Sequence, residues 1–96
     1  MHRVLLSLSI TPVNSTDKLL GDLKEVLEQR KHLDSPKVWW DEGKKLIFIE
    51  VGFDVPDRII AERHLNEEIA EVASAVIEDF DTYKVNVVKT DQLVTP

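Results

Sequence analysis

The chain has 96 residues, a formal net charge of −6 and no cysteine. This length suits one domain with a modest core, and the acidic balance disfavours nucleic acid or an anionic membrane as a partner. Disulfides and thiolate metal sites are excluded, and no apolar run approaches the ~20 residues needed to cross a bilayer. We therefore expect a cytoplasmic protein without membrane insertion, with one domain at residues 1–90 and a flexible tail at 91–96.

The first predicted element is a strand over residues 3–10, which alternates between two faces. Val4, Leu6 and Leu8 share one face with Ile10, and Leu5 lies on the other. A helix follows, with an N-cap at residue 14 or 15 and leucines at helical spacing to about residue 31. The sequence thus begins with a β-α unit.

A β-hairpin is predicted over residues 37–53, with its turn near "DEG". Gly43 can take the left-handed position of a three-residue loop that consists of residues 41–43. In the second strand of this hairpin, Ile47, Ile49, Val51 and Phe53 form the more apolar face. We expect that face to contact the helices.

The second helix is predicted over residues 57–80, and a last strand over residues 82–88. One apolar stripe of the helix includes Ile60, Leu65, Ile69, Val72, Ala73, Val76, Ile77 and Phe80. Glutamates such as Glu68 and Glu71 are expected on the solvent side. The order is β-α-β-β-α-β, which predicts a ferredoxin-like α+β sandwich: a four-stranded antiparallel sheet of order 4-1-3-2 with both helices on one face.

The other face of this sheet should be polar in a monomer, but here it carries apolar residues. Adjacent strand residues point to opposite faces, so either Trp39 or Trp40 must lie beside Phe48. The turn chemistry of a three-residue loop favours Trp40 outward, whereas a four-residue loop reverses the two. The register is left open between these alternatives.

An exposed apolar patch of this kind commonly marks an interaction site. We expect a homodimer or higher oligomer of a regulatory or assembly module, formed through this open face. The expected interface contains Leu5, Trp39, Trp40, Leu46, Phe48, Glu50 and Val88.

An alternative function is divalent-metal binding at the second helix. His64 and Glu68 are four residues apart and share a helix face, with Glu71 nearby and Asp57 at the helix start. Imidazole and carboxylate together suit a divalent cation. His32 more simply complements the C-terminal end of the first helix dipole.

Other functions have less support from the residues. The chain contains no nucleophile elbow and no phosphate-binding glycine loop, so we expect no enzyme and no required cofactor. Glu50 stands in the middle of the strand where an RNA-recognition domain places aromatic and basic residues. A small-ligand domain of the ACT type is a third possibility, because the loop after the first strand has a suitable length but lacks that family's glycine.

Residues 37–91 resemble the cytoplasmic C-terminal domain of cation-efflux transporters. The similar stretches are "KLIFIEVGFDVPD", "AERHLNEEIAEVASAVIEDF" and "KVNVVKTD". The resemblance implies a ferredoxin-like module for dimerisation and metal sensing, with His64 at a family metal position.

Overall fold

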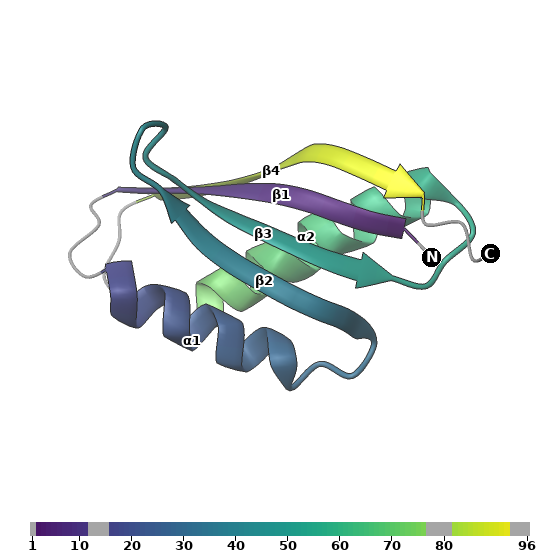
Figure 1. The fold of residues 1–96 in the computed structure, drawn as a ribbon, viewed down its shortest axis with the longest axis horizontal. Coiled ribbons are helices and arrows are strands. Elements are labelled where there is room, and N and C mark those ends of the chain that lie inside the picture. Colours follow the sequence, from purple (N-terminus) through teal and green to yellow (C-terminus); the bar gives the residue numbers. More distant parts are fainter. Residues whose placement is uncertain (1, 12–15, 77–81, 93–96) are drawn as a thin grey trace.

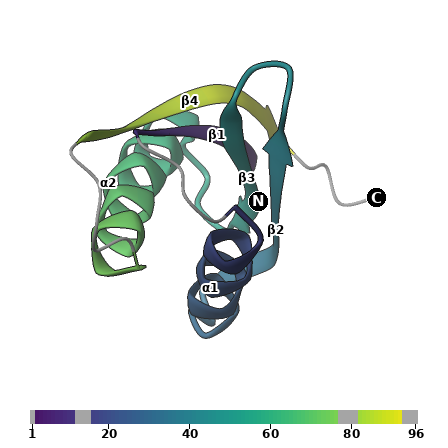
Figure 2. The same cartoon turned by 90° about the vertical axis from the view of Figure 1, so that its left-hand side faces the viewer.

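The computed structural model describes residues 2–11, 16–76 and 82–92. The elements are β1 (His2–Thr11), α1 (Thr16–Glu28), β2 (Leu33–Asp41), β3 (Leu46–Phe53), α2 (Arg58–Val76) and β4 (Thr82–Gln92). The strands form one antiparallel sheet in the order β2-β3-β1-β4 (Figure 1). Both helices lie on the same face of that sheet (Figure 2). The predicted ferredoxin-like fold is confirmed.

The core lies between the sheet and the two helices. In the central strands, alternation directs Val4, Leu6 and Leu8 of β1 and Ile47, Ile49 and Val51 of β3 into this core, where all six are buried. Burying a side chain of this size contributes roughly 1.5–3 kcal/mol. The central strands therefore contribute a large part of the hydrophobic stabilisation.

The last strand is longer than predicted. β4 pairs with β1 from Thr82 to Gln92, with one irregularity in register between Leu5 and Leu6. Because β1 supplies partners along its whole length, Asp91 and Gln92 belong to the sheet and not to a tail. Residues 93–96 of the predicted tail lie outside the described residues, as do the predicted N-cap and most of the loop considered for an ACT-like ligand.

The hairpin between β2 and β3 has a four-residue loop, residues 42–45. Lys45 takes the left-handed conformation, with a φ of 55°, and its N–H donates to the Asp41 carbonyl oxygen at 2.7 Å. The predicted left-handed Gly43 in a three-residue loop is therefore wrong. The Asp41 side chain also accepts a hydrogen bond from the Lys44 N–H at 3.0 Å, which stabilises the longer loop.

This loop length decides the orientation of the two tryptophans. Trp39 pairs with Phe48 on the open face, and Trp40 pairs with Ile47 and packs against the core. The outward orientation of Trp40, which a three-residue loop favours, is thus wrong. The observed register is that of the four-residue loop. One extra loop residue reverses both side chains, as the period of a strand requires.

The edge strand β2 begins at Leu33, four residues before the predicted start. Leu33 and Asp34 pair with the end of β3, and the register then shifts before Lys37. The irregular segment contains Ser35, with a φ of 45°, and Pro36. Proline has no N–H to donate to a ladder, so this edge has a local interruption.

Ile77 and Phe80 of the predicted α2 stripe lie outside the described residues, and Val76 is half-buried. The observed buried stripe leaves out Ile60 and includes Ala61 and Glu68. It consists of Ala61, Leu65, Glu68, Ile69, Val72 and Ala73. Ile60 is 56% exposed because it lies five residues before Leu65 and so on another side of the helix. Glu68 follows Leu65 by three residues and precedes Val72 by four, which places it on the stripe. Its carboxylate is therefore buried instead of solvated.

The described residues contain no helix that could cross a membrane. Within residues 2–11, 16–76 and 82–92, neither α1 nor α2 combines the length and apolar character that a transmembrane span requires.

Candidate metal centre

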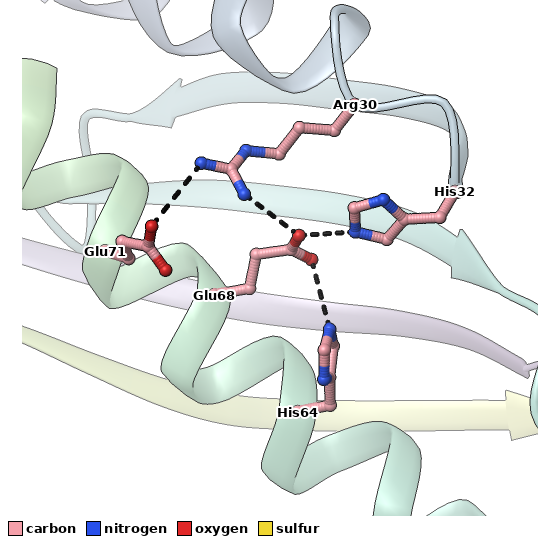
Figure 3. Close-up of polar contacts among 5 residues, drawn as sticks. All are labelled: Arg30, His32, His64, Glu68 and Glu71. Carbon is pink, nitrogen blue, oxygen red and sulfur yellow. Dashed lines mark hydrogen bonds and ion pairs between the residues drawn. The ribbon is translucent and has the colours of Figure 1, made fainter.

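Polar side chains gather where the turn after α1 passes over the middle of α2 (Figure 3). We call Arg30, His32, His64 and Glu68 the Glu68 cluster. The turn is fixed by its backbone, because the Leu33 N–H donates to the Arg30 carbonyl oxygen at 3.0 Å. The buried Leu33 side chain anchors the turn in the core. Arg30 and His32 are thereby held against α2.

Glu68 is the centre of this cluster, and only 6% of it is exposed. Its Oε1 accepts hydrogen bonds from Arg30 Nη1 at 3.2 Å and from His32 Nε2. Its Oε2 is buried and has no hydrogen-bond partner among the described residues. His64 Nε2 lies 3.7 Å from this oxygen, within ion-pair range but beyond hydrogen-bond distance. An unsatisfied buried oxygen costs about 1–3 kcal/mol.

Aromatic contacts fix the orientation of the two imidazoles. The Phe53 ring stacks on His64 with centroids 4.8 Å apart and an interplanar angle of 7°. The same ring meets His32 edge to face at 6.0 Å. Both imidazole rings therefore contact Phe53 at the end of β3, and the Nε2 atom of each ring faces Glu68.

A pocket of about 550 Å³ opens beside the cluster. It is lined by the cluster itself together with Phe53, Glu67 and Glu71. Glu71 lies on its exposed side, where its Oε1 is 4.0 Å from Arg30 Nη2. Glu68 is thus both buried and one of the residues that line this pocket.

Three side chains of this cluster have the chemistry and spacing of metal ligands. His32, His64 and Glu68 each offer a ligand atom, and these atoms lie within 4.8 Å of one another. Bonds of about 2.0–2.2 Å to a tetrahedral zinc ion place neighbouring ligand atoms roughly 3.3–3.6 Å apart. Coordination of one ion by all three would require the side chains to shift within their contacts with Phe53, and the metal would replace the direct contact between His32 and Glu68.

The structure brings together some of the residues predicted for a metal site and not others. His64 and Glu68 are adjacent as predicted, and Glu71 lies at the rim of the pocket. Asp57 is not at the cluster: its Oδ1 accepts hydrogen bonds from the N–H groups of Ile59 at 2.8 Å and Ile60 at 3.3 Å. It is the N-terminal cap of α2, a structural role that short carboxylates commonly have.

His32, Arg30 and Phe53 complete the site, and none of them is among the residues predicted for a metal site. The sequence predicts for His32 only an interaction with the dipole of α1, whereas its Nε2 contacts a carboxylate 36 residues away in the chain. No local spacing links these positions. The face assignment of Phe53 was a usable signal, because it directed the residue toward the helices at the end of β3.

The predicted interface residues occupy a different part of the molecule. Trp39 stacks on Phe48 at 5.7 Å, and Lys44 Nζ lies 5.6 Å from the centroid of the Phe48 ring. Phe48 is consequently buried, while Trp39 stays 37% exposed and Val88 53% exposed. Leu5 and Leu46 are half-buried on this face, and Glu50 pairs with Arg3. Trp40 does not belong to this surface, since it packs against the core.

Comparisons with known proteins identify no relative. No family model, no curated protein and no solved structure matches the chain. The resemblance to cation-efflux domains therefore gains no support beyond the shared fold, and the chemistry of the site rests on the geometry described above.

Proposed function

We propose that the protein is a divalent-metal-binding module whose ligands are His32, His64 and Glu68. The observation that carries this proposal is the buried Glu68 Oε2, which has no hydrogen-bond partner among the described residues and faces an imidazole nitrogen 3.7 Å away. A metal ion coordinated by this carboxylate would remove the unfavourable contribution of the unsatisfied oxygen.

The ligand types favour a first-row transition metal, zinc above all. Imidazole nitrogen suits zinc, copper, iron and nickel, whereas calcium and magnesium prefer oxygen ligands throughout. Two histidines and one glutamate form a ligand set used at zinc sites that keep a coordination position open. The stacked ring of Phe53 supports the same view, because it orients His64 toward the carboxylate before any ion binds.

Metal binding would also couple two parts of the fold. His32 belongs to the turn that follows α1, and His64 and Glu68 belong to α2. An ion held by all three joins these elements, so it stabilises the folded chain by about 2.7 kcal/mol at a free concentration 100 times the dissociation constant. This coupling supports a sensing or regulatory role more than a catalytic one.

Zinc titration followed by calorimetry tests the proposal. We expect saturable binding of one zinc ion per chain, and a loss of affinity of more than about 100-fold in His64→Ala, because a removed ligand should exceed the 10- to 100-fold effect of a residue that only supports one. His32→Ala should behave in the same way, because both imidazoles are proposed ligands.

Asp57→Ala is the matched control for this titration, because it removes a carboxylate from α2 without touching the cluster. It should lower the free energy of unfolding by about 0.5–2 kcal/mol through the lost cap and leave zinc affinity unchanged. Identical isotherms for the wild-type protein and His64→Ala would rule out the site.

A second candidate function is self-association through the open sheet face. Here the favouring observation is that Trp39 remains exposed although it already covers Phe48. Charges of both signs lie on the same face of the sheet: Lys37 is cationic, Arg3 pairs with Glu50, and Lys89 pairs with Asp91. A second copy of the chain fits such a face, because opposite charges can pair across a twofold axis while the apolar residues are buried.

Sedimentation velocity over a micromolar concentration range tests this second function. We expect wild-type protein to sediment as a dimer and Trp39→Lys as a monomer, because a buried ammonium without a partner is strongly unfavourable at an interface. Ile59→Lys is the matched control, since it makes the same change at an exposed apolar residue on α2 and should stay dimeric. A wild-type protein that remains monomeric would contradict self-association.

A further inference from the structure

The pocket beside the Glu68 cluster leaves room for a ligand on the metal. Three protein ligands do not fill the coordination sphere of a tetrahedral ion, and at least one position stays open for water or another molecule. The volume of about 550 Å³ lies within the range of small-molecule sites. An incoming ligand could therefore reach the metal from the pocket.

Arg30 is placed to contact such a ligand. Its guanidinium donates to Glu68 Oε1 at 3.2 Å and lies 4.0 Å from Glu71 Oε1, with 29% of its side chain exposed. A metal bound to Glu68 Oε2 would lie close to the guanidinium that contacts Oε1 of the same carboxylate, and it would repel the positive charge of Arg30. The planar fork of a guanidinium matches a carboxylate or another oxyanion with two parallel hydrogen bonds.

The charges that line the pocket make anion binding depend on the metal. Among the lining residues, Glu67, Glu68 and Glu71 are anionic and Arg30 alone is cationic when the histidines are neutral. The lining thus carries two more negative than positive charges, which repels an anion. A divalent ion would balance this excess, so an anion would enter only after the metal.

We propose that the metal-loaded Glu68 cluster binds a small carboxylate, with one carboxylate oxygen on the open metal position and Arg30 donating to the anion. This inference rests on the proposed metal site and names the ligand class of that site. The metal supplies attraction for the anion, and Arg30 supplies selectivity for a group that accepts two hydrogen bonds.

Absorption spectroscopy of the protein loaded with cobalt(II) in place of zinc tests this proposal, because the cobalt spectrum depends on the ligands of the ion. We expect acetate to change the spectrum of the cobalt-loaded protein in a saturable way. In Arg30→Gln, acetate affinity should fall roughly tenfold or more, as expected for loss of a charge-assisted hydrogen bond. Azide binds the metal but cannot accept two parallel hydrogen bonds, so its affinity should change much less.

Two further variants test whether the effect of Arg30 comes from its positive charge alone. Arg30→Lys keeps the positive charge but not the fork and should also weaken acetate more than azide. Arg63→Gln removes one positive charge from an exposed position of α2 that does not line the pocket, and should bind acetate like wild type. Failure of cobalt to bind would overturn the metal site itself. Cobalt binding without an acetate response, or with equal affinity in Arg30→Gln, would overturn the anion site alone.

Discussion

Glu68→Met is expected to abolish zinc binding while the free energy of unfolding stays equal to that of the wild type or rises by about 1–4 kcal/mol. Methionine fills a similar volume on the buried stripe of α2, and it removes a carboxylate that is desolvated and incompletely hydrogen-bonded. Arg30 and His32 lose an acceptor, but their side chains are 29% and 47% exposed, so water can replace it.

The zinc affinity and the free energy of unfolding of Glu68→Met together distinguish a metal-binding role of Glu68 from a structural one. Chemical denaturation gives the stability, and calorimetry gives the zinc affinity. Glu25→Met, which removes a carboxylate from an exposed position of α1, should leave zinc affinity unchanged. A loss of several kcal/mol in Glu68→Met together with retained zinc binding would show that the carboxylate serves only to hold α2 in place.

Leu65→Ala is expected to lower the free energy of unfolding by about 2–5 kcal/mol. The side chain is fully buried in the core between α2 and the sheet, so its truncation loses hydrophobic burial and leaves a cavity. Domains of this size are stable by only about 5–15 kcal/mol, so a large fraction of the protein's stability would be lost. The melting temperature should fall accordingly.

Ile60→Ala on the same helix is the matched control, because it removes a side chain that is 56% exposed. Its effect should stay within about 0.5 kcal/mol. Urea denaturation of both variants measures the difference. Equal destabilisation would mean that α2 is rotated about its axis relative to the structure described above.

The fold followed from the sequence because its signals are local and periodic. Alternation in β1 and β3 gave the buried faces correctly, and the order of elements gave the topology. The tryptophan orientation could not be decided in this way, because it depends on a single extra residue in the loop. Turn chemistry pointed to Gly43, whereas Lys45 has the left-handed conformation.

The candidate site was predictable only where its residues are close in the chain. His64 and Glu68 share a helix face by spacing alone, but the burial of Glu68 contradicts the usual behaviour of a glutamate and was not anticipated. Arg30 and His32 reach the site through the tertiary approach of the turn after α1 to α2. No periodicity encodes that approach, so only the packed structure shows it.

The interruption of β2 at Ser35 and Pro36 has a consequence for how copies of this chain can meet. An uninterrupted edge strand offers a row of free backbone groups on which further chains can add, which leads to continuous β-sheet aggregates. A proline and a residue with positive φ break that row on this edge. Addition of further chains to the sheet is therefore disfavoured at β2. Contacts between copies at this edge would involve side chains instead of backbone hydrogen bonds.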